Sequence, residues 1–590
     1  MKERKDMDPR FMWKLTDLYE DEQALERAFA ETGAMAEALD GAVERLGDDP
    51  ESFRECFDRI YEASQAAEKL SIYAMLRMSA DASDTASQEL NDRATRLWVS
   101  LASRISLASA RVTAMDDETF ESLMKAEGAE KYRHAAEDMR RNREHMLSDE
   151  MEVFMVKLSD FAGTPDNAFG MFTDTDMTFP DTPAEDGSMV SLTNGNFNVF
   201  RESRQRSVRQ AAFENYLGEY RRFINTFSVL YSSLVKYDNL TAETRRFASA
   251  MDMALFANDI PSSVYENLVD SVHRSLPAMK RYLSLRKRVM GLDEIDMYDL
   301  YVPMVGNVDM KVPFGDARAL VKEALKPLGE EYQHLLDRAF DENWMDVYEN
   351  RGKRSGAFST AAYGVHPFVL LNYTDTLDDA YTVAHELGHS MHSFFSDRAQ
   401  DYVYHNYAIF IAEVASTVNE VLLTLYLLEK ETDGDRRAYI LNKFAEGFRT
   451  TVYRQTLFAE FEKKAHEAAQ NGEALTAKKL CGIYGDLLRE YYDGAQVPEL
   501  MSCEWSYIPH FYSSFYVYQY ATGFSSAVAI ARHIKETGDA SGYLKFLSLG
   551  SSVYPVEALK TAGVDLTVPG TVDDALKLFD ETVKELEKLI

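Results

Sequence analysis

Two histidines four residues apart, with a glutamate directly after the first, form the segment of this chain with the clearest capacity for chemistry. The segment reads His385-Glu386-Leu387-Gly388-His389. On a helix the two imidazoles lie about 40° apart around the axis and one turn apart along it. Both can therefore bind one Zn²⁺ at roughly 2.0–2.1 Å, while Glu386 holds the water of the metal. The pattern predicts a zinc site that hydrolyses peptide bonds.

The residues around this motif favour a helix that carries it. Residues 374–379 supply N-cap candidates and early acidic side chains, which are typical of a helix start. Residues 380–395 contain no proline, and their single glycine, Gly388, lies inside the motif. The chain has 12 histidines in 590 residues, so the motif can also arise by chance. In that case it would be two surface histidines on an amphipathic helix beside an unrelated glutamate. The helical context argues against that alternative.

A catalytic zinc usually has three protein ligands and one open position. His392 shares a helix face with His385 and His389, but seven residues separate it from His385 by about 10.5 Å along the axis. One straight helix cannot bring all three rings to one ion, so we expect His392 to be a neighbouring polar group. The third and sixth positions after His389 are His392 and Phe395, so the longer glycine-and-histidine zinc pattern is absent.

A second helix must then supply the third ligand. Glu413 lies inside the apolar run 408–420, between Ile411 and Val414. Burying a carboxylate there is costly unless it is paired or bound to a metal, so we predict Glu413 as the ligand rather than the partner of an arginine. Glu420 lies two turns further along the same face. It is either a second carboxylate that orients a ligand imidazole or an ordinary buried pair, and the sequence leaves both open.

With these residues identified, the chain resembles oligoendopeptidase F, in the thimet oligopeptidase family of zinc metallopeptidases. The motif helix and residues 412–417 match the metal site of that family, and the similarity extends to both ends of the chain. The further matching segments are 13–19, 298–301, 355–358 and 562–566. The resemblance implies a mainly α, multi-lobed, clam-like body with a deep channel that admits short peptides and excludes folded proteins. It also implies one Zn²⁺ per chain and cleavage of internal bonds in oligopeptides.

The resemblance points to a second active-site segment, residues 510–523. In the wider family a histidine followed by spaced tyrosines donates hydrogen bonds to the oxyanion of the tetrahedral intermediate and to substrate carbonyls, which implies His510, Tyr516 and Tyr520 here. Tyr516 and Tyr520 are four residues apart and share a helix face, whereas Tyr518 points elsewhere. The segment has less glycine before its tyrosines than the thimet pattern. The alternative is that this aromatic stripe belongs to the core.

The expected chemistry assigns one role to each group. His385, His389 and Glu413 hold Zn²⁺, which lowers the pKa of its water to about 7. Glu386 removes the proton from that water and later returns it to the leaving nitrogen, a contribution of ~10²–10⁴-fold. His510 or a tyrosine polarises the peptide carbonyl together with the metal.

A short apolar run before the motif, residues 367–373, has strand composition and predicts a small β-sheet next to the zinc helix. An exposed edge there would pair with an extended peptide by strand addition, which reads main chain rather than side chains. Residues 355–358 are a candidate mobile loop beside it. The sheet is equally explained as a support for the zinc helix, and both interpretations can hold together.

Bulk properties narrow the possible partners. A net charge of −33, from 97 acidic and 64 basic residues, opposes binding to nucleic acid or to an anionic membrane. The start of the chain lacks the apolar stretch of a secretory signal, and no run of about 18 apolar residues predicts a membrane span. Three cysteines are too few and too scattered for a disulfide framework, which favours a reducing cytoplasm. The partners expected are short peptides; the sequence does not indicate an oligomeric state.

The chain is long enough for two or more lobes. We predict an N-terminal helical lobe over 1–175, with an apolar helix face at Phe53, Cys56, Phe57, Ile60 and Tyr61. A hairpin and boundary region follows over 176–200, with strands near 177–179 and 189–192, and then a catalytic domain over 201–590. Residues 572–590 predict a closing helix.

Two other functions compete with an endopeptidase. A zinc carboxypeptidase of similar helical build would need groups that recognise a free C-terminus, and the sequence does not reveal them. A non-catalytic helical scaffold that kept the motif would need neither an intact Glu386 nor all three ligands.

Overall fold

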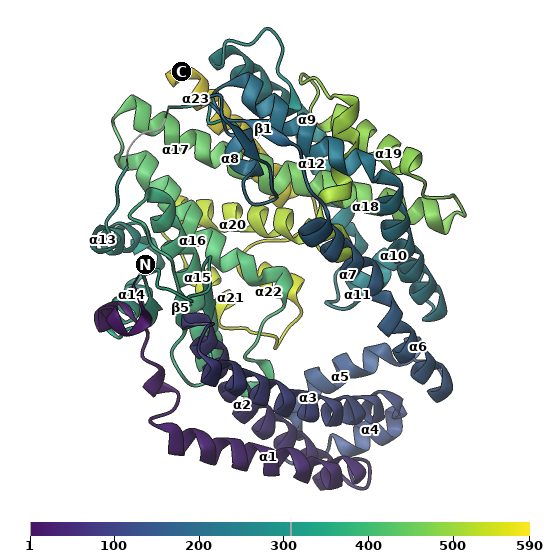
Figure 1. The fold of residues 1–590 in the computed structure, drawn as a ribbon. Coiled ribbons are helices and arrows are strands. Elements are labelled where there is room, and N and C mark those ends of the chain that lie inside the picture. Colours follow the sequence, from purple (N-terminus) through teal and green to yellow (C-terminus); the bar gives the residue numbers. More distant parts are fainter. Residues whose placement is uncertain (1, 307–309) are drawn as a thin grey trace. The chain divides into compact units, whose positions relative to one another are not determined.

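The computed structural model describes residues 2–306 and 310–590 and is predominantly helical (Figure 1), which confirms the predicted mainly α class. Its residues fall into two compact units, each assembled from segments that are distant in sequence. The first comprises Met1–Glu144, Met310–Tyr426 and Ile530–Val564, and the second comprises His145–Asp309, Leu427–Ala529 and Asp565–Ile590. The consecutive domain boundaries expected near residues 175 and 200 stay a prediction.

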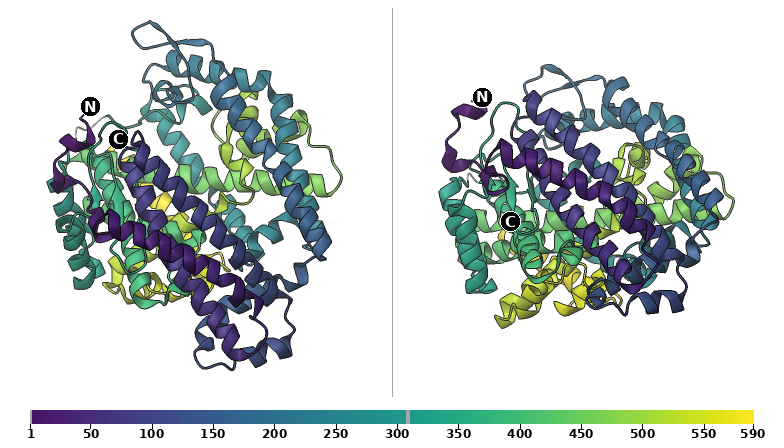
Figure 2. Two further views of the ribbon diagram at one scale, coloured as in Figure 1. Left: turned by 60° about the horizontal axis from the view of Figure 1, so that its bottom comes forward. Right: turned by 90° about the horizontal axis from the view of Figure 1, so that it is seen from below.

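Three long helices pack against one another in the first unit: α1 (Glu22–Glu44), α2 (Pro50–Ala80) and α3 (Thr85–Ala114). Figure 2 shows them as the purple to dark blue helices lying side by side. Each begins at an aspartate, Asp21, Asp49 or Asp84, whose side chain accepts a backbone N–H of the first turn. The predicted apolar face of α2 is buried in their shared core, with Tyr61 partly buried at its margin.

The other elements of the first unit are mostly short. They are η1 (Arg4–Asp6), η2 (Pro9–Phe11), η3 (Leu15–Asp17), α4 (Asp117–Leu123), η4 (Ala129–Tyr132), α5 (Arg133–Arg141), α13 (Phe314–Ala324), η8 (Lys326–Leu328), α14 (Glu330–Asp341), α15 (Leu377–Ala399), η9 (Tyr402–Tyr404), α21 (Ser541–Leu547) and α22 (Pro555–Thr561). Helix α16 (Ile409–Lys430) contributes its residues through Tyr426, and η5 (Asn142–His145) ends the first segment.

The second unit is built from longer helices, of which α12 and α23 pack closely together. Its elements are α6 (Asp149–Ala162), α7 (Thr164–Met171), η6 (Phe172–Asp176), β1 (Asp181–Pro183), β2 (Met189–Ser191), α8 (Phe197–Arg201), α9 (Arg206–Arg222), α10 (Ile224–Thr244), α11 (Ala250–Phe256), α12 (Ser262–Val289), η7 (Met297–Asp299), α17 (Gly434–Gly447), η10 (Phe448–Tyr453), α18 (Arg454–Gln470), α19 (Ala477–Tyr491), η11 (Glu499–Tyr507), η12 (Pro509–Tyr512), the first part of α20 (Tyr518–Thr537) and α23 (Gly570–Leu589).

A three-stranded sheet lies beside the motif helix α15, as predicted. Strand β5 (Phe368–Leu370) is central, parallel to β3 (Met345–Asp346) and antiparallel to β4 (Phe358–Thr360). All three residues of β5 are fully buried, so the prediction of an exposed edge within 367–373 was wrong. The edge strand that contacts α15 is β4, which begins at Phe358, the last residue of the segment expected to be a mobile loop.

Helix α16 is strongly apolar. Among the described residues it is the one helix with the length and composition to cross a membrane, yet 61 % of the relevant window is buried inside the protein. Core helices of globular proteins meet the same criterion. The absence of a membrane partner stays a prediction.

Three smaller expectations met different outcomes. Strands β1 and β2 pair antiparallel as the predicted hairpin, although the first strand starts later than expected, at Asp181. The closing helix is present as α23, with Leu576, Phe579, Val583 and Leu586 buried. The cysteines are less scattered than the sequence indicates, because Cys481 on α19 and Cys503 on η11 place their sulfurs 3.8 Å apart as free thiols.

Candidate metal centre

Helix α15 carries both motif histidines on one face. It begins with a capping box in which the Thr376 hydroxyl accepts the backbone N–H of Asp379 and the Asp379 carboxylate accepts that of Thr376. Further along the helix, His385 and His389 place their ring centroids 4.9 Å apart with the planes at 79°. The two rings thus face one region of space from successive turns, as the spacing predicted.

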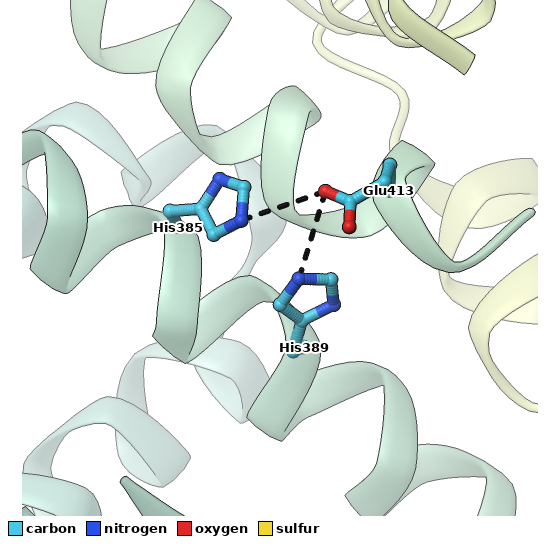
Figure 3. A group of neighbouring side chains, drawn as sticks. All are labelled: His385, His389 and Glu413. Carbon is cyan, nitrogen blue, oxygen red and sulfur yellow. Dashed lines mark ion pairs between the residues drawn. The ribbon is translucent and has the colours of Figure 1, made fainter. Parts of the chain in front are cut away.

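Helix α16 brings Glu413 to these rings. One carboxylate oxygen, Oε2, lies 3.5 Å from His385 Nε2 and 3.7 Å from His389 Nε2. Figure 3 shows both imidazoles turned toward this oxygen. The ligand atoms of the three residues lie within 4.8 Å of one another. Donors at 2.0–2.2 Å from a tetrahedral ion would be about 3.4 Å apart, which is close to the two distances from Glu413, so this set can hold one small cation.

A glycine allows the two helices to approach. A Cβ atom at Gly388 would lie 2.5 Å from the Cα of Ser416 and 2.7 Å from the carbonyl oxygen of Ala415, both backbone atoms of α16. Asn419 of α16 then donates to the carbonyl of Ala384 on α15 at 2.9 Å. This close backbone contact, one turn from Glu413, fixes how far that carboxylate reaches toward the rings.

Glu420 orients the first ligand. His385 Nδ1 and Glu420 Oε1 form a hydrogen bond of 2.6 Å, which turns Nε2 toward Glu413. Burial alone would lower the pKa of His385, but the hydrogen bond and the nearby carboxylates outweigh it and raise the pKa to about 9. Of the two roles left open for Glu420, this contact supports the orienting one, because its carboxylate binds His385, a candidate ligand, directly.

The second histidine is electrostatically different. Burial, together with the charge of His385, lowers the pKa of His389 to about 4. A neutral imidazole with a free lone pair is the form that binds a metal. The donor set therefore consists of a neutral imidazole, a second imidazole oriented through Nδ1 and one carboxylate oxygen, which fits a dication such as zinc.

Glu386 lies beside the donors without joining them. Its side chain is buried, with 6 % exposure. Burial raises the pKa of Glu386 to about 7, with Glu413 and Glu420 adding to the shift and His385 opposing it. A carboxyl group with such a pKa can both accept and release a proton near neutral pH.

His392 lies outside the candidate ligand group, as expected. It is fully buried, and its ring stacks on Tyr407 with centroids 3.5 Å apart. Neither ring nitrogen has a hydrogen-bond partner among the described residues, and burial lowers the pKa of His392 to about 3.

The residues of the second predicted segment belong to the second unit. His510 lies in η12 and is exposed, and its Nε2 lies 3.5 Å from the hydroxyl of Tyr520 in α20. Tyr516 and Tyr520 hold their rings perpendicular at 5.4 Å. Tyr518 is buried against Tyr265, so the core interpretation applies to it, whereas Tyr516 and Tyr520 are only partly buried. The catalytic roles of His510, Tyr516 and Tyr520 stay predictions.

Sequence reasoning overlooked how α15 is supported. Ser390, in the turn after the motif, forms a 2.9 Å hydrogen bond with Ser359 of the edge strand β4. The signal for the Gly388 contact was present, since a glycine inside a helix otherwise costs about 1 kcal/mol relative to alanine. Nothing in the sequence indicated the link between the two serines, because they are 31 residues apart.

Comparison with known proteins identifies the family of this chain. The model of peptidase family M3 matches residues 199–578, and that of oligopeptidase F matches residues 112–179. Oligopeptidase PepF of Bacillus subtilis is 39 % identical over 98 % of this chain and 87 % of its own. The oligoendopeptidase F homolog of Lactococcus lactis subsp. lactis is 37 % identical over 100 % of this chain and 99 % of its own.

Solved structures show the same likeness. A peptidase from Chlamydophila abortus superimposes with a TM-score of 0.94 at 30 % identity, covering 100 % of both chains. Oligoendopeptidase-F from Enterococcus faecium superimposes with a TM-score of 0.74 at 34 % identity, covering 96 % of this chain and 99 % of its own. This chain belongs to peptidase family M3 and is a metallopeptidase of the oligoendopeptidase F kind, which confirms the resemblance drawn from its motifs.

Proposed function

We propose that this protein is a zinc-dependent endopeptidase that hydrolyses internal bonds of short oligopeptides through a metal-activated water. The observation that carries the proposal is the convergence of His385, His389 and Glu413 on one point, with Glu386 buried beside it. Family membership and the names of the relatives, oligopeptidase and oligoendopeptidase, support the substrate class.

The donor set supports zinc as the metal. Two imidazoles and one carboxylate are a common catalytic zinc set, and they leave a fourth position for water. Their side chains are partly exposed, at 27 % for His385, 17 % for His389 and 41 % for Glu413, so solvent and substrate can reach the donor atoms. Zinc, when bound, supplies Lewis acidity toward the substrate carbonyl and lowers the pKa of its water to about 7.

Glu386 is proposed to move the proton. Its raised pKa suits a group that accepts a proton from the attacking water and then delivers it to the leaving nitrogen. Glu420 holds the tautomer and angle of His385 throughout, because its carboxylate accepts the Nδ1–H.

His510 and Tyr520 are proposed as hydrogen-bond donors to the oxyanion, with Tyr516 donating to a substrate carbonyl. Supporting this, His510 Nε2 and the Tyr520 hydroxyl converge to 3.5 Å at an exposed position, which is how preorganised donors are arranged. Removing one such donor costs about 10²–10³-fold in kcat in other hydrolases.

The edge strand β4 is proposed to hold the substrate backbone. Phe358, Ser359 and Thr360 are half-buried, and within the described sheet their strand pairs on one side only, with β5. An extended peptide added to the other side would be held by its main chain, with broad tolerance for side chains. Because β4 also contacts α15 and bonds to Ser390, a peptide placed there would lie along the motif helix.

We also infer a reducing, cytoplasmic location, without a nucleic-acid or membrane partner. The three thiols are free, and the net charge of −33 would repel polyanions.

One experiment separates the candidate functions. An internally quenched peptide blocked at both ends should be cleaved by wild type, left intact after chelation, and cleaved again after Zn²⁺ is restored. Glu386→Gln should keep stoichiometric zinc and lose ~10²–10⁴-fold in kcat. A carboxypeptidase would leave the blocked peptide intact, and normal turnover by the Glu386→Gln variant would refute the proton-transfer role. Mass spectrometry of a digested peptide library would then give the length limits.

A further inference from the structure

A strained backbone turn connects His510 to the helix that carries Tyr520. Phe515 adopts φ +57°, in the left-handed region that a bulky side chain rarely occupies. The turn joins η12 to the start of α20 and accompanies the 3.5 Å approach of the two polar side chains. A conformation of this kind persists only where its surroundings enforce it, and the contacts of Ser514 and Phe515 supply that constraint.

The first contact is a buried acid. Glu462 of α18 is fully buried, and its Oε1 accepts the backbone N–H of Phe515 at 3.1 Å. Burial raises the pKa of Glu462 well above its ordinary value, which favours the neutral form of this acceptor. Its second oxygen has no hydrogen-bond partner among the described residues. Burying this side chain costs solvation free energy, and the hydrogen bond described for it is the one from the Phe515 N–H.

The second contact comes from another helix. Asp238 of α10 accepts the hydroxyl of Ser514 at 2.7 Å, and its same oxygen lies 3.3 Å from His466 Nε2. The ring of His466 in turn lies against Phe515, with centroids 4.6 Å apart. Two adjacent residues of the turn are therefore bound by acids from two helices that pack on each other.

Aromatic packing fixes both sides of the turn. Phe511 and Phe515 are buried, and Phe511 contacts Phe461 and Tyr231 at centroid distances of 5.0 and 5.9 Å. His510, next to Phe511, remains exposed, while Tyr516, next to Phe515, is only half-buried. The apolar residues are anchored inward, and their polar neighbours are presented outward.

We propose that Glu462 and Asp238 are positioning residues that hold His510 and Tyr520 in their donor geometry by fixing the turn at Ser514 and Phe515. The hydrogen bonds described for Glu462 and Asp238 go to the turn and to His466, so both acids act through the turn. The proposal rests on the function assigned above to His510 and Tyr520. It goes beyond that function by naming the groups that preorganise the donors, and preorganisation is what makes such donors effective.

The test compares three substitutions at one position with a milder one at the turn. Glu462→Ala removes the acceptor for the Phe515 N–H and should lower kcat by about 10–100-fold, while KM and bound zinc stay unchanged. Glu462→Gln keeps an acceptor oxygen in the same place and should restore kcat. Glu462→Leu fills the space without an acceptor and should behave like the Ala variant. Ser514→Ala removes only the bond to Asp238 and should lower kcat in a protein that folds normally.

Glu460→Ala is the matched control. Glu460 lies on the same helix and is buried to 7 % exposure, but it binds His273, Lys464 and Tyr491 rather than the turn. Its loss should lower the unfolding temperature without changing kcat below that temperature. If the Glu460 and Glu462 variants lost kcat equally, the effect of Glu462 would be explained by lower stability alone, and the proposal would be overturned.

Double variants separate this proposal from the assigned function. If Glu462 acts through the donors, Glu462→Ala should add almost nothing in a His510→Ala, Tyr520→Phe background. A full additional loss in that background overturns the positioning role and leaves the donor role standing. Unchanged kcat in the His510→Ala, Tyr520→Phe protein itself overturns the donor role, and the positioning role falls with it.

Discussion

Replacing Gly388 by alanine tests whether the contact between α15 and α16 sets the metal centre. The added Cβ would lie 2.5 Å from the Cα of Ser416, whereas ordinary contacts begin at 3.4 Å. The obstructing atoms are backbone, so the helices must separate by about 0.9 Å instead of rotating a side chain aside. Metal–ligand distances tolerate only about ±0.2 Å, and Glu413 is one turn from the contact.

The expected result has two parts. Overpacking should cost about 1–3 kcal/mol in the free energy of unfolding. Zinc affinity should fall by about 10–100-fold, comparable to the loss of an orienting partner, because Glu413 moves away from His385 and His389. Competition with a chelator of known affinity measures the second effect, and chemical denaturation of the protein kept free of metal measures the first.

Gly33→Ala provides the matched control. Gly33 lies inside α1, and a Cβ there would meet nothing within 4 Å. This variant should gain up to about 1 kcal/mol from helix propensity and bind zinc normally. If the Gly388→Ala protein also kept wild-type zinc affinity and turnover, the close contact would not position Glu413, and our account of the site would be wrong.

Three further predictions follow from other parts of the chain. Glu420→Ala should weaken zinc binding by about 10–100-fold while the chain stays folded, measured by the same competition; unchanged affinity would contradict an orienting role. Burial alone would lower the pKa of His405, but hydrogen bonds to Asp397 and Glu68 outweigh it and raise the pKa to about 9. Its stabilisation should be complete below the unfolded pKa of about 6.5 and lost as pH rises through about 9, on the order of 3 kcal/mol. Chemical denaturation of wild type and His405→Gln across that pH range checks this prediction. If the hydrogen bonds of His405 contribute nothing, the free energy of unfolding should change with pH in the same way in both proteins. Finally, the hydrogen bond with Cys503 lowers the pKa of Cys481 to about 7, so iodoacetamide should label Cys481 before Cys56 at neutral pH and Cys503→Ser should slow that labelling, as followed by mass spectrometry.

The sequence was sufficient for features that depend on spacing within one helix. The four-residue interval between the motif histidines fixed their shared face, and seven residues excluded His392 by distance alone. The apolar run around Glu413 singled out this carboxylate, although its side chain is 41 % exposed in the structure rather than buried. The amphipathic face of α2 and the closing helix α23 follow from the same periodicity.

Features that depend on pairing between distant segments were decided only by the tertiary structure. The composition of residues 367–373 indicated a strand, but which strands form the sheet edges depends on partners elsewhere in the chain, and β3 and β4 lie at the edges. The role of Glu420 was open until the crossing of α15 and α16 put it 2.6 Å from His385.

The same reason applies to the groups that sequence reasoning did not find. Glu462 and Phe515 are 53 residues apart, and Asp238 and Ser514 are 276 apart. Periodicity reports which face of an element is buried, but it carries no information on which distant backbone N–H a buried acid will meet. The identities of the candidate ligands were therefore set by the local sequence, whereas their distances and the groups that orient them were set by helix packing.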